Sequence, residues 1–269
     1  MHALVDYYVA NRAEFYAEAG HEKLLVGLKK FVTPCPDDGR TVLGIDVGCC
    51  VGDYLPHIRD ICIETNRVVY CFEPNPVNLA TLEPKIKQDS GCRLFKLCVS
   101  NENTTASLYD WKGQTNTTGN GLAGLRSGGE KICDVEVRRL DDIIDEQCGE
   151  HSDAIIKFIK VDTEGNDGNV IKGLERYLPN TRYIVFECSD CLDDHRGPGI
   201  PNPMADIVQF LSMHGFDTYR IGTKKLLKVN DEFWSQVYDD VKFWSNCFAL
   251  KKDDDLIHKL IDETFAYRY

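Results

Sequence analysis

The stretch 41–53 constrains the fold of this chain more than any other. It opens with an apolar run at 42–47 that is rich in β-branched residues and too short for a buried helix, so it predicts a central strand. Gly48 and Gly52 follow, and the segment 54–62 then has helical spacing. A strand, a glycine turn and a helix in this order predict a cradle in which main-chain N–H groups face a bound ligand.

An acidic residue follows this turn at a distance that suits a nucleoside cofactor. Glu73 stands at the end of a second apolar run, 67–72, where its carboxylate can accept hydrogen bonds from both hydroxyls of a ribose. The turn lacks the third glycine of the G-x-G-x-x-G pattern that binds pyrophosphate. Asp46 beside the turn repels phosphate but can hydrogen-bond an ammonium group. The pattern therefore favours S-adenosylmethionine over NAD.

Beyond position 41, short apolar runs alternate with helical stretches, which is typical of a doubly wound parallel α/β sheet. We expect seven strands, at 42–47, 67–72, 93–99, 155–161, 182–187, 216–221 and 244–250.

Three additions to this sheet are predicted. Residues 1–33 read as two helices broken at Gly20, which form a helical cap over one edge of the sheet. Alternating segments at 104–109 and 131–138 predict an inserted β-hairpin. Its glycine-rich loop, 112–131, is a candidate lid with Arg126 as a ligand contact, and the tail, 253–269, predicts a terminal helix.

Four motifs are spaced along the central part of the chain. They are Asp46-Val-Gly-Cys-Cys-Val-Gly52, Phe72-Glu-Pro-Asn-Pro76, Arg139-Leu-Asp-Asp142 and Lys160-Val-Asp-Thr-Glu-Gly165. In order and spacing they resemble the motifs of the FkbM-type S-adenosylmethionine-dependent methyltransferases, over about 42–190. The chain departs from that family at Cys50, where Asn is usual, and at Asp167, where Glu is usual.

The resemblance implies a Rossmann-like methyltransferase sheet whose last strand is antiparallel. It also implies methylation of hydroxyl groups on glycans and natural products, and a helical cap close to the cofactor cleft, from which Tyr7 or Tyr8 can line the acceptor pocket. The cofactor contacts that it implies are Asp46, Gly48, Cys49, Cys50, Val51, Gly52, Glu73, Pro74, Asn75, Val99, Ser100 and Asp162.

The candidate catalytic residues follow the two strands 155–161 and 182–187. Alternation places Lys160 and Asp162 on one side of the sheet, and Glu187 ends the neighbouring strand about 5 Å away. Two carboxylates at that distance share a proton or bind a cation such as Mg²⁺, and Lys160 is the other group that can relieve their repulsion. Asp162 is the predicted base. Glu164 is a candidate metal ligand, acceptor contact or helix cap, and His195 is a second candidate base in the loop 189–206.

Length and composition limit the remaining possibilities. The 269 residues suit one domain, with a helical cap at 1–40, a cofactor-binding core at 41–188 and an acceptor loop with closing strands at 189–269. The net charge of −12 has the wrong sign for a nucleic-acid footprint. No apolar run reaches the ~18 residues of a membrane span, and the N-terminus lacks a signal-peptide pattern. The twelve cysteines contain no pair of C-x-x-C motifs, which indicates reduced thiols in a cytoplasmic protein.

These observations predict an O-methyltransferase that acts on a small-molecule or glycan acceptor. Three alternatives stay open: a methyltransferase of RNA ribose hydroxyls, a nicotinamide oxidoreductase, and a module that binds S-adenosylmethionine without turnover. The sequence indicates neither an oligomeric state nor whether a divalent metal takes part.

Overall fold

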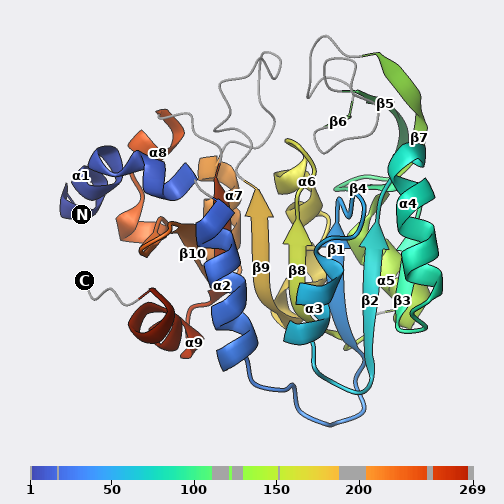
Figure 1. Ribbon diagram of the computed structural model, residues 1–269, viewed down its shortest axis with the longest axis horizontal. Helices are drawn as coiled ribbons and strands as arrows, with labels where there is room; N and C mark the ends of the chain where they lie inside the picture. The colour runs from blue at the N-terminus through green and yellow to red at the C-terminus, as the bar shows by residue number, and fades with distance from the viewer. Residues whose placement is uncertain are drawn as a thin grey trace.

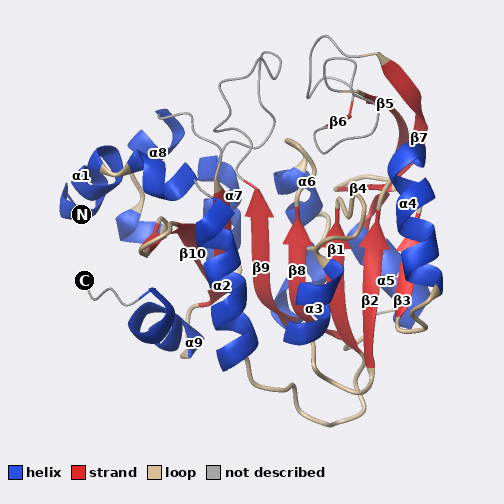
Figure 2. Ribbon diagram, in the orientation of Figure 1, coloured by secondary structure: helices blue, strands red, loops and turns tan. Residues whose placement is uncertain are grey.

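The computed structural model describes residues 2–16, 18–110, 121–122, 130–150, 152–187, 204–240 and 245–265. Its main feature is a sheet with the strand order β11-β10-β12-β9-β8-β1-β2-β3 (Figures 1 and 2). The strands from β9 to β3 run parallel, and β12 lies antiparallel between β9 and β10. Their bounds are β1 (Val42–Val47), β2 (Arg67–Phe72), β3 (Cys92–Phe95), β8 (Ile155–Val161), β9 (Thr181–Glu187), β10 (Phe216–Ile221), β11 (Leu226–Lys228) and β12 (Asn246–Lys251).

The doubly wound α/β sheet with an antiparallel strand is confirmed. The short edge strand β11 adds an eighth strand to the seven expected ones. The single strand expected at 93–99 is wrong, because two strands of different sheets share this stretch. β3 pairs with β2, whereas β4 (Cys98–Ser100) pairs in parallel with β7 (Lys131–Arg139) of a second sheet.

The second sheet has the order β4-β7-β5-β6. β5 (Thr104–Tyr109) and β7 pair antiparallel, which confirms the predicted hairpin, and β6 (Gly121–Leu122) joins β5. Most of the glycine-rich loop, with Arg126, lies outside the described residues.

Helices cover both faces of the main sheet (Figure 1). On one face α2 (Glu18–Phe31), α3 (Leu55–Ile61), α4 (Pro76–Lys87) and α9 (Leu256–Lys259) share a hydrophobic core with the sheet. On the other face a second core includes α5 (Leu140–Cys148), α6 (Asp167–Lys172) and α7 (Met204–Met213). α8 (Val237–Asp240) packs near α7, and a π-helical turn (Leu260–Phe265) follows α9. No helix in the described ranges is long and apolar enough to cross a membrane.

The N-terminal cap differs from its prediction at Gly20. The break lies earlier, between α1 (His2–Ala10) and α2, at a 3₁₀ helix (Arg12–Tyr16), and Gly20 lies inside α2. A Cβ at position 20 would come within 2.7 Å of the Gly222 carbonyl oxygen. Glycine is therefore needed here for close packing on the loop after β10, and it does not end the helix.

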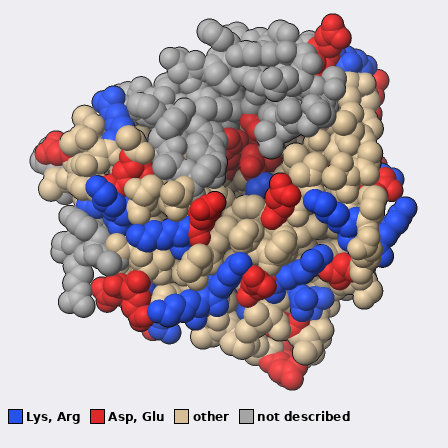
Figure 3. All heavy atoms as spheres, viewed as in Figure 1, with Lys and Arg blue, Asp and Glu red and all other residues tan. Residues whose placement is uncertain are grey.

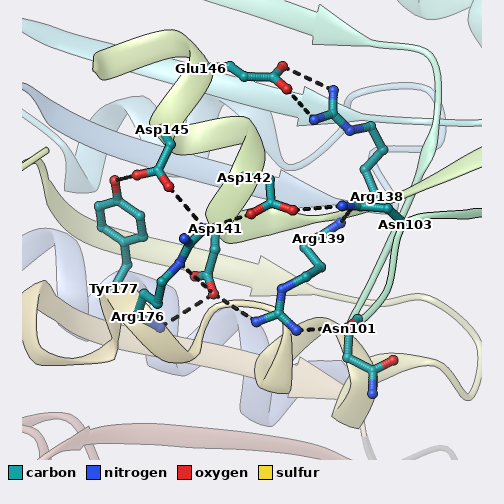
Figure 4. Close-up of polar contacts among 10 residues, drawn as sticks. All are labelled: Asn101, Asn103, Arg138, Arg139, Asp141, Asp142, Asp145, Glu146, Arg176 and Tyr177. Atoms are coloured by element: carbon teal, nitrogen blue, oxygen red, sulfur yellow. Dashed lines mark hydrogen bonds and ion pairs between the residues drawn. The ribbon is translucent and has the colours of Figure 1, made fainter. Parts of the chain in front are cut away.

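The third motif, at 139–142, forms a network of ion pairs at the start of α5 (Figure 4). The buried Asp141 carboxylate accepts a hydrogen bond from Arg139 at 2.9 Å and lies 3.4 Å from Nε of Arg176. Burial raises the pKa of Asp141, and the two guanidinium groups oppose this rise. Arg176 also pairs with Asp142 at 2.7 Å, and Asn103 donates to the same carboxylate. The motif thus ties α5 to the second sheet and to the segment after α6.

Candidate active site

A cavity of about 210 Å³ lies along the carboxyl edge of the main sheet. Figure 3, viewed as Figure 1, shows acidic side chains in a hollow near the level at which the central strands of Figure 1 end. The cavity runs across the ends of four neighbouring strands, in the order β8-β1-β2-β3. The lining residues that follow these strands are, in the same order, Asp162, Gly48, Glu73 and Leu97. The second sheet adds Leu108 from β5 to its wall.

The glycine turn after β1 is held by hydrogen bonds to the end of β2 and to Glu73, which follows it. The N–H groups of Gly48 and Cys49 both donate to the Phe72 carbonyl at 3.0 Å, and the Cys50 N–H donates to Glu73 at 2.7 Å. For Gly48, Cys49 and Cys50, the prediction that the N–H groups of the turn face a ligand is therefore wrong. A turn whose donors are already used is poorly suited to phosphate, which agrees with the missing third glycine.

Cys50, where the resemblance leads us to expect Asn, has a backbone conformation that suits Asn. Cys50 has a φ of 50°, in the left-handed region. Asn tolerates this region better than most side chains, whereas other L-residues lose roughly 1–2 kcal/mol. With Cys in this conformation, the Cys50 N–H still donates to Glu73.

Glu73 is fixed by three donors and lines the cavity. Its Oε2 accepts from Cys50, and its Oε1 accepts from the Asn75 N–H at 2.9 Å and from the Asn78 side chain at 3.3 Å. Burial raises the pKa of Glu73, and these hydrogen bonds oppose that rise. A carboxylate has about four lone-pair positions, so Glu73 keeps some capacity to accept from a diol.

Lys160 forms the floor of the cavity with two carboxylates. Its ammonium group donates to the Gly48 carbonyl at 3.0 Å and lies 3.6 Å from Asp46 and 3.4 Å from Asp162. Burial lowers the pKa of Lys160, but the charges of Asp162 and Asp46 raise it more, so the pKa lies above its ordinary value. Asp46 is fully buried behind Lys160 and is absent from the described cavity lining. The predicted contact of Asp46 with a ligand ammonium group is therefore wrong, because the register that sets Asp46 opposite Lys160 pairs these two side chains.

Three carboxylates meet where β8 and β9 end. Asp162, Glu164 and Glu187 each place an oxygen within 4.8 Å of the others, which confirms the expected approach of Asp162 and Glu187. Within the described ranges these are the residues that could hold a divalent cation. Glu164 has a φ of 57°, and Asp167 braces this turn by accepting from the Thr163 and Gly165 N–H groups. Burial, with the charge of Asp162, raises the pKa of Asp167 to about 7.

Most of the predicted site residues meet at the cavity. Those lining it are Gly48, Cys49, Cys50, Glu73, Pro74, Asn75, Val99, Lys160, Asp162 and Glu164.

Other predicted residues lie elsewhere. The Val51 carbonyl accepts from Lys85, and the Ser100 carbonyl packs against Gly173, where a Cβ would come within 2.1 Å. Neither residue belongs to the described lining of the cavity. Gly52 and Glu187 do not belong to it either, and the Glu187 side chain is buried. His195 lies outside the described residues.

The expected tyrosines of the cap also miss the cavity. Tyr8 receives a hydrogen bond from Arg220 at 2.6 Å, and Tyr7 donates to Glu14. The sequence reasoning instead missed several lining residues: Asp53, Tyr54, Phe72, Asn78, Leu97, Cys98, Leu108, Thr163 and Asn166. Asn166 donates to the Val99 carbonyl at 2.9 Å, and Leu108 could have been found from the alternation of the hairpin strand.

A family model, the methyltransferase FkbM domain, matches residues 46–218, which is more than half of the chain. The chain belongs to the FkbM methyltransferase family. Among curated proteins, this family member is 27% identical over 158 residues to the 2-O-methyltransferase NoeI of Sinorhizobium fredii (strain NBRC 101917 / NGR234). The match covers 54% of this chain and 63% of NoeI, so the chain spans less than two thirds of that relative.

Solved structures of other methyltransferases resemble this FkbM-family chain more distantly. The methyltransferase FkbM of Methylobacillus flagellatus KT is 15% identical, with a TM-score of 0.45, over 91% of this chain and 60% of that one. Magnesium protoporphyrin IX methyltransferase of Synechocystis PCC 6803, solved with bound SAH, is 11% identical, with a TM-score of 0.38, over 87% and 84%.

Proposed function

We propose that this FkbM-family chain is an S-adenosylmethionine-dependent O-methyltransferase that acts on a hydroxyl of a sugar, glycan or similar small molecule. The observation that carries the proposal is the layout of the cavity. Glu73, the buried carboxylate that follows the glycine turn at the distance typical of a ribose-binding acid, lies in the middle of the cavity. The carboxylates of Asp162 and Glu164 line its β8 end. Family membership supports methyl transfer, and the name of NoeI, a 2-O-methyltransferase, supports oxygen as the acceptor atom.

The residues of the chain fit this cofactor. Glu73 would hold the ribose hydroxyls, the apolar side chains of Leu97, Val99 and Leu108 would hold the flat base, and the β1 and β8 ends would hold the amino acid part. When bound, the cofactor supplies a methyl group on a sulfonium.

Asp162 is the residue that we assign to the acceptor's proton. Its side chain is 40% exposed, whereas Asp46 is fully buried, so Asp162 can reach a bound acceptor. A carboxylate within hydrogen-bond reach accepts the hydroxyl proton as the new bond to oxygen forms. Lys160 keeps its charge throughout, because Asp46 remains beside it.

A divalent cation on Asp162, Glu164 and Glu187 is the other route to the same chemistry, because it would polarise the acceptor hydroxyl. Exhaustive chelation separates the two routes. Turnover that survives chelation assigns the step to a carboxylate base, and turnover that is lost and restored by magnesium assigns it to a cation at this cluster.

We expect Glu73→Ala to weaken binding of S-adenosylhomocysteine by roughly 1–3 kcal/mol, the cost of leaving ribose hydroxyls unpaired. Isothermal calorimetry measures this change, and NAD should not bind the unmodified protein. Glu83→Ala is the matched control, because Glu83 pairs with Lys96 on the surface and does not line the cavity. Tight NAD binding, or an unchanged affinity in Glu73→Ala, would contradict the cofactor assignment.

The acceptor is expected to be a neutral polyhydroxylated molecule. The carboxylates at the strand ends suit hydrogen bonding to hydroxyls, and the net charge of −12 repels a phosphate backbone. A donor-consumption assay over matched panels of glycosides, amines and short RNAs measures the preference. Turnover is expected with glycosides, and turnover confined to amines or RNA would contradict the proposal.

A further inference from the structure

A row of polar residues lies beneath α2, on the same face of the sheet as Lys160. The register sets Glu187 of β9 opposite Asn246 of β12. It also sets Val161 opposite Phe186, so the next residues, Asp162 and Glu187, lie side by side. Asp162, Glu187 and Asn246 therefore form the row. His21 of α2 is buried above this row. Three segments far apart in the sequence therefore meet at the β8 end of the cavity.

The contacts of His21 define which of its nitrogens carries the proton. The Asn246 side-chain nitrogen lies 3.2 Å from Nδ1 of His21, and an amide nitrogen can only donate, so Nδ1 is the acceptor. The proton then sits on Nε2, which bonds the Tyr54 hydroxyl. Burial and the charge of Lys160 lower the pKa of His21 to about 4, so the imidazole is neutral at pH 7. A neutral His21 that donates to the Tyr54 oxygen directs the hydroxyl proton of Tyr54 away from itself.

Tyr54 connects His21 with the cavity. It lines the cavity after the glycine turn, and its ring centre lies 5.4 Å from the Lys160 ammonium group. The ring also packs against His21 and His57. Tyr54 therefore lies beside Lys160, at the β8 end of the cavity.

The proposed cofactor places its amino acid part at this same end, because Glu73 holds the ribose and the apolar wall holds the base. That part carries an ammonium group, which suits Glu164, and a carboxylate, which the carboxylates of Asp162 and Glu164 repel. Among the described residues that line the cavity, Lys160 is the only one with a basic side chain. Its ammonium group already contacts Gly48, Asp46 and Asp162. The carboxylate of the cofactor therefore needs a hydrogen-bond donor other than Lys160.

We propose that the Tyr54 hydroxyl binds the carboxylate of the cofactor, and that His21, held by Asn246, is the positioning residue that orients this hydroxyl. The inference rests on the proposed function. It gives the N-terminal cap a part in cofactor binding.

Two probes that differ in the amino acid part test this assignment. S-adenosylhomocysteine carries the carboxylate, and 5′-methylthioadenosine lacks the whole amino acid part. Tyr54→Phe should weaken binding of S-adenosylhomocysteine about tenfold to a hundredfold, as expected for a hydrogen bond to a charged group, and leave 5′-methylthioadenosine unchanged. Calorimetry on the full chain measures both. Equal weakening of both probes, or no weakening of either, would overturn the proposal.

The role of His21 is tested by a double-mutant cycle. His21→Phe should weaken S-adenosylhomocysteine selectively when Tyr54 is present, and should add nothing in the Tyr54→Phe background. His21→Gln, whose amide nitrogen takes the place of Nε2, should retain most of the affinity. Additive losses in the cycle would show that His21 does not act through Tyr54.

A matched control excludes a general effect of removing a buried hydroxyl. Tyr183→Phe removes a hydroxyl that donates to Asp254 at 3.0 Å and is remote from the cavity lining. It should change neither affinity. If the unmodified protein binds neither probe, the proposed function itself fails, and this result is distinct from a failure confined to Tyr54.

Discussion

Replacing Asp162 by Asn is expected to lower turnover by about 10²-fold or more while cofactor affinity changes little. The amide keeps the size and the hydrogen-bonding reach of the carboxylate but cannot take the acceptor's proton. Asp162 is the exposed member of the pair of carboxylates around Lys160, whereas Asp46 is fully buried. The loss should therefore appear in kcat, measured at a cofactor concentration that saturates the enzyme.

The matched control for Asp162 is Asp53→Asn. Asp53 lines the same cavity, but its side chain is 86% exposed and pairs only loosely with Lys85 at 3.8 Å. It should keep nearly full turnover. Normal turnover in Asp162→Asn would show that the base lies elsewhere, and a parallel fall in cofactor affinity would assign Asp162 to the ammonium group of the cofactor.

Gly48→Ala is expected to cost the most stability of any change proposed for this chain. Gly48 has a φ of 80°, and a Cβ there would lie 1.9 Å from the main-chain oxygen of Asp162. The positive φ alone costs roughly 1–2 kcal/mol. The overlap involves backbone on both sides, so β1 and β8 would have to separate at the cavity, and the total loss should exceed about 4 kcal/mol. Binding of S-adenosylhomocysteine should be lost as well.

Denaturant unfolding measures this cost, and Gly39→Ala separates its two causes. Gly39 has nearly the same φ, 85°, but a Cβ added there would meet no atom within 4 Å. Gly39→Ala should therefore lose only the conformational part, on the order of 1–2 kcal/mol. Equal losses in the two variants would show that the contact between Gly48 and Asp162 relaxes without cost.

The sequence predicted the central strands closely because each is a short apolar run with a clear end. β1, β2, β8 and β10 begin and end where they were expected. Where two strands follow one another without a break, apolar periodicity does not tell which partner each one takes. The division of 93–99 between two sheets was missed for this reason.

The candidate site was predicted in part for a similar physical reason. Motif residues near the turn, such as Glu73, reach the cavity because strand ends place them there. The pairing of Asp46 with Lys160 depends on the register of two strands that are over a hundred residues apart. The contacts of His21 join residues separated by 33 and 225 positions, and a single histidine on a helix gives no sign of either.

The cavity has walls from two sheets, since Leu108 belongs to β5 and the strand ends belong to the main sheet. Any molecule that touches both walls resists their separation, so its binding free energy also stabilises the packing of the hairpin on the main sheet. Amide hydrogen exchange in β5 and β7 should therefore slow as ligand concentration rises, in step with the fraction of protein that is bound. The hairpin thereby reports on occupancy of the cavity, although Leu108 is the residue of β5 and β7 that lines it in the described structure.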